Sequence, residues 1–148
     1  ASQKVGQSAT PFFLDRIDIQ CEITPVPFKD ISQAAPGEPS ATIRERVIAA
    51  RQIQEQRYKD IKGIHCNAPM TERMIHQYAE PDADSVEVLR SAMERLSLSA
   101  RAYSRILKVA RTIADLDGSE KVQLPHIAEA IGYRQLERGD WTERGMYS

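Results

Sequence analysis

The chain has 148 residues, enough for one domain of ordinary size, and its 20 basic and 21 acidic residues leave a formal net charge of −1. This balance excludes a global electrostatic attraction to nucleic acid, so any nucleic-acid site must be local. Only 6% of the residues are aromatic, which favours helix packing over a β-sandwich.

The cysteines and the hydropathy of the sequence indicate the cellular compartment in which we expect the protein. Cys21 and Cys66 form no CxxC pair, which favours a reduced cytosolic setting and leaves one disulfide open. No apolar run approaches transmembrane length, and the N-terminus lacks the apolar core of a signal peptide. We therefore expect a cytoplasmic protein with no membrane partner.

The first 40 residues predict a strand followed by a linker. Residues 1–10 show no periodicity, but from Arg16 onward polar and apolar residues alternate. The apolar residues that share one face are Ile17, Ile19, Cys21 and Ile23, as in a β-strand. Residues 24–40 are rich in proline, which indicates a linker and a domain boundary. Because a lone strand is not stable, the chain looks like the end of a larger protein.

The region that follows predicts two helices. Residues 42–45 form a capping-box pattern, and apolar positions at helical spacing extend that helix to about Lys59. Residues 61–69 are a loop, and Thr71 can cap a short helix that ends near Tyr78.

Two longer amphipathic patterns come next. Asp84 and Glu87 form a box-like start for a third helix, whose apolar stripe ends at Leu96. Ser99 can cap a fourth helix, the most regular of the chain, which ends near Gly118.

Pro125 stands at a plausible first position for a fifth helix through Ile131. The predicted fold is therefore mainly α, a bundle of four or five helices preceded by an orphan strand.

No motif for self-contained catalysis is present. The sequence lacks a G-x-x-x-x-G-K-[ST] phosphate loop, an H-E-x-x-H motif and a G-x-S-x-G motif. His65 beside Cys66 hints at a metal ligand pair, but no second pair follows, so a structural or surface role is favoured and we expect no metal site.

The fourth helix carries a basic row. Arg101, Arg105, Lys108 and Thr112 follow i, i+4, i+7, i+11 spacing, with Arg111 beside them. Such a row could bind phosphates of a nucleotide or a nucleic acid. A solvated helix face, neutralised by Glu94 or Asp115, is the alternative that periodicity alone favours. Arg101 is unusual because it lies in the first turn, where the helix dipole prefers anions.

Two further residues have open roles. Arg16 lies between Asp15 and Asp18, which favours a local ion pair, although an arginine presented to a phosphate on a neighbouring subunit is the alternative. Trp141 could dock on the bundle, belong to a frayed tail, or stack on a base.

The sequence resembles the C-terminal part of the ComM/YifB family of magnesium-chelatase-like AAA+ ATPases over about residues 11–141. The motifs that carry this resemblance are Phe13-Leu14-Asp15-Arg16-Ile17-Asp18, Ile43-Arg44-Glu45-Arg46-Val47, residues 96–116, and His126-Ile127-Ala128-Glu129-Ala130-Ile131.

The resemblance implies a domain organisation and two site residues. Residues 1–39 would be the tail of the AAA+ core, including the remnant strand, and a linker; residues 40–138 would be the helical lid, and residues 139–148 a C-terminal tail. Arg16 would be the arginine finger, and Arg101 the sensor-2 arginine that reaches the γ-phosphate. Arg105, Lys108 and Arg111 remain candidates for phosphate or nucleic-acid contact.

The resemblance also implies partners. The parent would be a hexameric ring that uses ATP and Mg²⁺ and acts on DNA by branch migration in natural transformation. This chain alone would bind neither ATP nor Mg²⁺ and would be inactive, because it lacks Walker A and Walker B segments. The alternatives are the lid of a magnesium-chelatase subunit and a stand-alone helical module that binds nucleic acid.

Overall fold

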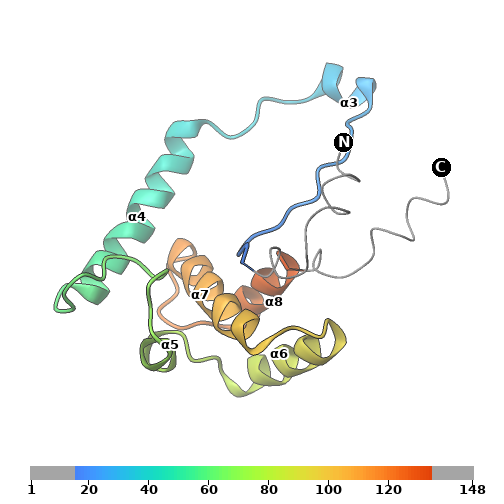
Figure 1. The fold of residues 1–148 in the computed structure, drawn as a ribbon. Coiled ribbons are helices and arrows are strands. Elements are labelled where there is room, and N and C mark those ends of the chain that lie inside the picture. Colours follow the sequence, from blue (N-terminus) through green and yellow to red (C-terminus); the bar gives the residue numbers. More distant parts are fainter. Residues whose placement is uncertain (1–15, 135–148) are drawn as a thin grey trace.

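In the computed structural model, the described residues 16–134 form α-helices and contain no strand (Figure 1). The helices are α3 Phe28–Gln33, α4 Ser40–Tyr58, α5 Glu72–Tyr78, α6 Ala83–Arg95, α7 Ala100–Leu116 and α8 Leu124–Gly132. The mainly helical fold predicted from the sequence is confirmed. None of these helices is long and apolar enough to cross a bilayer. Residues 1–15 and 135–148, with Asp15 and Trp141, lie outside the described residues.

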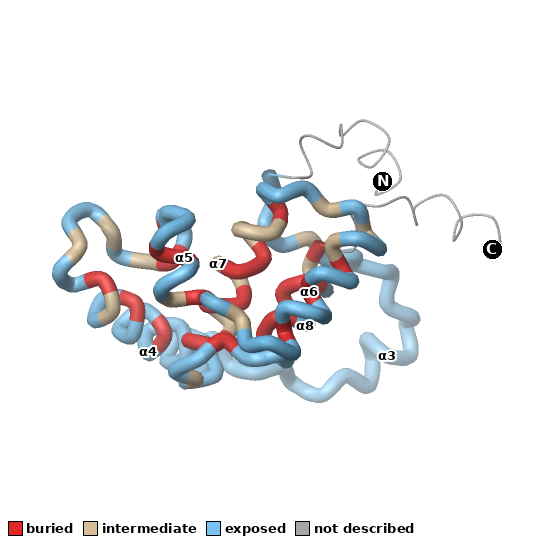
Figure 2. Tube along the Cα trace, turned by 90° about the horizontal axis from the view of Figure 1, so that it is seen from below, coloured by how far each residue is buried: buried red, intermediate tan, exposed pale blue. Residues whose placement is uncertain are grey.

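Helix α7 is the centre of the core. Its buried apolar positions recur at helical spacing and are Ala102, Ile106, Leu107, Ala110 and Ala114. Helices α8, α4 and α5 pack against α7, and α6 packs against α8. Figure 2 shows the buried residues concentrated in this group, whereas α3 is exposed along its whole length.

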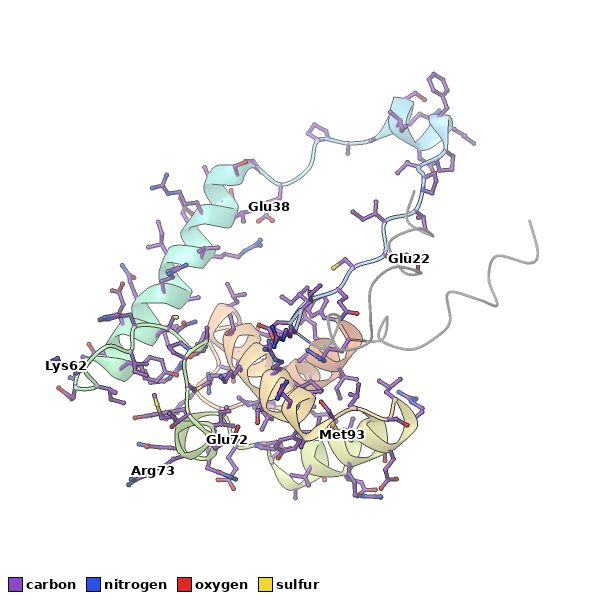
Figure 3. The ribbon with its side chains drawn as sticks, in the orientation of Figure 1. Glu22, Glu38, Lys62, Glu72, Arg73 and Met93 are labelled. Carbon is purple, nitrogen blue, oxygen red and sulfur yellow. The ribbon has the colours of Figure 1, made fainter. Side chains whose placement is uncertain are left out.

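Helix α4 begins earlier than the capping-box pattern predicts. The carbonyl oxygen of Pro39 already accepts the backbone N–H groups of Thr42 and Ile43, at 3.1 and 3.3 Å, so the first turn forms at Ser40. The predicted box at residues 42–45 is therefore wrong. Glu38, just before α4 (Figure 3), instead accepts a hydrogen bond from Arg46 at 2.9 Å.

The predicted strand is also wrong for the residues that the structure describes. Residues 19–27 are extended, but no neighbouring strand within 16–134 offers them hydrogen-bond partners. The proline-rich linker, in turn, contains the short helix α3, whose first N–H groups are accepted by Pro27.

Side-chain caps fix the starts of three helices. The hydroxyl groups of Thr71 and Ser99 accept N–H groups in the first turns of α5 and α7, which confirms both predicted caps. In α6 the cap is Asp82, which accepts the N–H of Ser85 at 2.9 Å, and not Asp84. Asp84 lies inside the first turn, where its charge favours the helix dipole.

Two left-handed residues end α6 and α7. Gly118 has φ 67°, and the N–H of Ser119 reaches back to the carbonyl of Ala114 at 2.8 Å. Ser97 has φ 44°, and the N–H of Leu98 reaches back to Met93 at 3.0 Å. Both ends are Schellman turns, but only α7 places glycine at the left-handed position.

Candidate functional site

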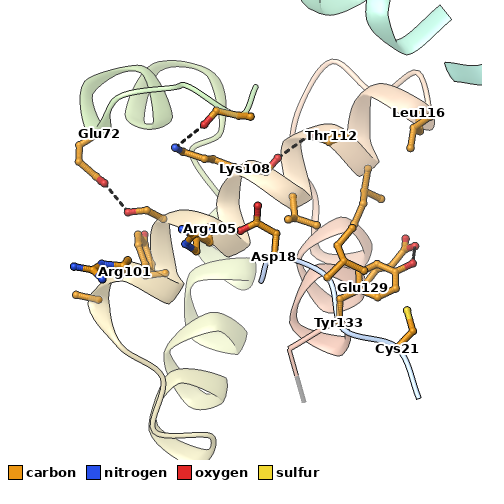
Figure 4. A pocket seen from close by; sticks show the side chains of 17 residues that line it. Asp18, Cys21, Glu72, Arg101, Arg105, Lys108, Thr112, Leu116, Glu129 and Tyr133 are labelled. Carbon is orange, nitrogen blue, oxygen red and sulfur yellow. Dashed lines mark hydrogen bonds and ion pairs between the residues drawn. The ribbon is translucent and has the colours of Figure 1, made fainter. Parts of the chain in front are cut away.

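A groove of about 1100 Å³ runs along the exposed side of α7. Its walls come from α7, α8, the loop before α5, and the extended segment at Asp18–Cys21. We call it the α7 groove (Figure 4). It contains three cations and three carboxylates, namely Arg101, Arg105, Lys108, Asp18, Glu72 and Glu129. The groove therefore has no strong net positive charge.

Arg101 differs from the other cations of the α7 groove. It is exposed in the first turn of α7, and among residues 16–134 it has no hydrogen-bond or ion-pair partner. The cap at Ser99 fixes this turn, so the guanidinium extends from a rigid base. A forked, permanently charged donor without a carboxylate partner is suited to bind a phosphate.

Arg105 and Lys108 are already engaged (Figure 4). Arg105 Nη1 donates to Asp18 Oδ1 at 2.6 Å and to the Arg16 carbonyl at 3.0 Å. Lys108 Nζ donates to the Ala68 carbonyl at 2.9 Å. Both cations therefore also hold together parts of the chain that are distant in sequence.

Arg111, the fourth predicted phosphate contact, is buried. Only 2% of it is exposed, and its guanidinium donates to Asp115 and to the carbonyls of Tyr78, Ser119 and Glu120. Arg111 is close to the basic row in sequence, but it lies on the buried side of α7. Its side chain therefore points into the bundle, toward the turn that follows α7. Arg111 is therefore not available to an external phosphate.

Asp115 is the centre of a buried polar cluster that the sequence analysis did not predict as a unit. It receives hydrogen bonds from Arg57 of α4, Asn67 of the following loop, and Arg111. Asn67 also accepts from the Tyr58 hydroxyl at 2.8 Å. The sequence analysis named Asp115 as a neutralising carboxylate, and it does pair with Arg111 at 3.0 Å.

The pKa values in this cluster follow from burial and charge. Burial opposes ionisation of Asp115, but hydrogen bonds from Arg57 and Asn67 and the two arginine charges together hold its pKa below the ordinary value. The hydrogen bond to Asp115 raises the pKa of Arg57. Burial lowers the pKa of Arg111 and raises that of Tyr58.

Arg16 lies at the edge of the described residues and is exposed. Asp18, one of the two carboxylates that flank Arg16 in the sequence, forms an ion pair with Arg105 at 2.6 Å. The Arg16 carbonyl accepts a hydrogen bond from Arg105, which lies one helical turn after Arg101 on α7 (about 6 Å along the axis).

The His65 and Cys66 pair gains no further ligands in the structure. Within residues 16–134, no three histidine, cysteine or acidic side chains come together as a metal site. Cys21 and Cys66 are both free thiols.

Residues 16–134 thus form a helical bundle with an arginine-bearing groove along α7, which defines a domain of the helical-bundle class. Residues 37–134 match the family described as "Magnesium chelatase, subunit ChlI C-terminal". The chain belongs to this family, and its sequence corresponds to the C-terminal region of the ComM/YifB proteins.

Three relatives illustrate the match. The chain is 40% identical to "Competence protein ComM" of Haemophilus influenzae over 127 residues, which cover 85% of this chain and 24% of that protein. It is 41% identical to "Uncharacterized protein YifB" of Salmonella typhimurium over the same shares. An uncharacterized protein of Mycobacterium tuberculosis is 32% identical over 131 residues, 88% of this chain and 25% of that protein. The chain thus spans about a quarter of the length of these relatives.

Proposed function

We propose that this chain is the C-terminal lid of a ComM-like AAA+ ATPase, and that Arg101 contacts the γ-phosphate of ATP held by other parts of the full-length protein. Among residues 16–134, the observation that carries this proposal is the exposed, unpartnered guanidinium of Arg101 in the α7 groove. In that position it would stabilise the charge that develops as the phosphoryl group is transferred.

The cationic side chain of Arg101 fits the phosphate end of a nucleotide. Bound ATP supplies the phosphoanhydride that is hydrolysed, and Mg²⁺ would neutralise its β- and γ-oxygens. This chain contains no phosphate loop, and its residues 16–134 gather no set of carboxylates for Mg²⁺. Its own contribution is the cationic side chain of Arg101, with Arg16 as the arginine finger toward a neighbouring protomer.

The same proposal covers the assembly and its substrate. The full-length protein would form a hexameric ring in the cytoplasm, and the lid would transmit the nucleotide state to the neighbouring subunits. We propose DNA as the substrate, with branch migration in natural transformation as the task. The name "Competence protein ComM" of the Haemophilus relative supports this choice.

Two alternatives remain for testing. The family description favours a lid of a magnesium chelatase, although no motif for a porphyrin is present in the sequence. A stand-alone module that binds nucleic acid has less support, because the cations of the α7 groove are balanced by carboxylates.

The test is the substitution Arg101→Ala in the full-length protein, with steady-state ATP turnover as the measurement. Removal of a donor that acts in the transition state lowers kcat by about tenfold or more. Arg73→Ala is the matched control, because Arg73 of α5 is exposed outside the α7 groove and points away from the bundle (Figure 3). Equal turnover in the two variants would remove the sensor role.

The choice of substrate has its own test. ATP turnover of the full-length protein is measured with branched DNA, linear DNA and a metal-free porphyrin. Stimulation by branched DNA supports the motor, and stimulation by the porphyrin with Mg²⁺ supports the chelatase. Salt-sensitive DNA binding by this chain alone would favour the stand-alone module.

A further inference from the structure

The extended segment at Arg16–Gln20 is bound to the bundle at three consecutive places. Arg105 of α7 donates hydrogen bonds from Nη1 to both the Asp18 carboxylate and the Arg16 carbonyl. Two further hydrogen bonds come from Tyr133 and Arg134, just after the end of α8. The backbone N–H of Gln20 donates to the Tyr133 carbonyl at 2.8 Å, and Arg134 Nη1 donates to the Ile17 carbonyl at 3.3 Å.

Arg105 is the only described α7 residue whose side chain donates hydrogen bonds to this segment. Its side chain is 29% exposed and that of Asp18 is 53% exposed, so the pair lies at the rim of the α7 groove. Loss of the Arg105 side chain would therefore remove the hydrogen bonds to Asp18 and to the Arg16 carbonyl, while those from the residues after α8 would remain.

We propose that Arg105 is a positioning residue, which with Asp18 latches the segment that carries Arg16 onto α7, so that Arg16 and Arg101 move as one unit. We call this pair the Asp18–Arg105 latch. Arg105 then has a role different from phosphate contact, because its charge is used within the chain. The consequence for ATP hydrolysis rests on the proposed function of Arg16, whereas the latch itself does not.

The latch predicts that loss of the Arg105 side chain speeds hydrogen exchange at the Gln20 amide. The N–H of Gln20 is protected by its bond to Tyr133, so its exchange rate reports whether the segment is docked. An ion pair at a surface contributes little by itself, and the additional charge-assisted bond to a carbonyl strengthens the contact. In Arg105→Ala we expect Gln20 to exchange about two- to tenfold faster.

Two further variants separate a latch from a general loss of structure. The double variant Asp18→Arg with Arg105→Asp swaps the two charges and rebuilds the ion pair in reverse. We expect it to restore at least half of the protection of the Gln20 amide that Arg105→Ala loses. Lys108→Ala leaves the Gln20 rate unchanged, since Lys108 lies on the same face of α7 but donates to Ala68. Unchanged Gln20 exchange in Arg105→Ala, or no recovery on charge exchange, would overturn the latch.

The consequence for catalysis is measured in the full-length protein with Arg16→Ala, Arg105→Ala and the double variant. If Arg105 acts through Arg16, the double variant loses no more kcat than Arg16→Ala alone. Losses that multiply would mean that Arg105 does not act by positioning Arg16. Unchanged turnover in Arg101→Ala would remove the sensor role and leave the latch standing, so the two failures are distinguishable.

Discussion

Arg57 holds Asp115 through both of its terminal nitrogens, so a bidentate ion pair joins the last turn of α4 to the last turn of α7. The Asp115 side chain is completely buried, and 13% of the Arg57 side chain is exposed. Because Arg111 approaches the same carboxylate, one negative charge is shared between two guanidinium groups. This buried pair therefore ties α4 to the rest of the bundle.

Asp115→Asn should destabilise the chain by about 3–5 kcal/mol, because it leaves two buried cations without their shared counter-charge. The free energy of unfolding in urea measures this loss. The matched control is Glu94→Gln, which breaks an exposed pair with Arg90 and should cost less than about 0.5 kcal/mol. A loss for Asp115→Asn as small as that of the control would contradict the central role of Asp115.

The same carboxylate predicts how stability depends on pH. The folded protein lowers the pKa of Asp115, so the unfolded chain takes up the proton first as the pH falls. Its contribution is fully present above the unfolded pKa of about 4 and is lost as the pH falls toward the folded pKa. Urea unfolding between pH 7 and pH 3 should therefore show the gap between the native chain and Asp115→Asn narrowing below about pH 4. A constant gap would contradict this linkage.

The two arginines at opposite ends of α7 should respond differently to substitution. Arg111→Met removes the donors that bind Asp115 and three carbonyls, and should destabilise the chain by about 3 kcal/mol. Arg101→Ala, at an exposed position, should change stability by less than about 0.5 kcal/mol. Thermal unfolding compares the two. A large loss in Arg101→Ala would show that this side chain supports the fold.

The Schellman turns at the ends of α6 and α7 predict two substitutions that change the stability of the chain in opposite directions. Ser97→Gly should stabilise the chain by about 0.5–1 kcal/mol, because glycine adopts a positive φ without strain. Gly118→Ala should destabilise it by about 1 kcal/mol for the same reason. Chemical denaturation of both variants gives the change in the free energy of unfolding for each. A loss of stability in Ser97→Gly would contradict the backbone argument.

Local signals in the sequence predicted the helices that begin with a side-chain cap. Thr71 and Ser99 were recognised because each precedes a helical pattern and satisfies free N–H groups. The start at Asp82 was missed because Asp84, two residues later, has the same chemistry. The start of α4 was missed because a backbone carbonyl, at Pro39, replaces the side-chain cap.

Contacts between distant residues could not be predicted in this way. Arg101 and Arg111 are both arginines on one helix, and only the packing of α4 and the turn after α7 decides which of them is buried. The pair of Arg57 with Asp115 spans 58 positions, for which periodicity carries no information. The alternation at Ile17–Ile23 indicates a strand correctly only where a second strand is available to pair with it.

The continuous exposure of residues 21–49 has a practical consequence. This stretch includes Phe28, which is 83% exposed, followed by Lys29, so it offers cleavage sites for both chymotrypsin and trypsin. A brief digestion should cut there before it cuts the packed helices. Such a cut breaks the covalent connection between the bundle that begins with α4 and the segment at Arg16–Gln20, which then stays on the bundle only through its non-covalent contacts.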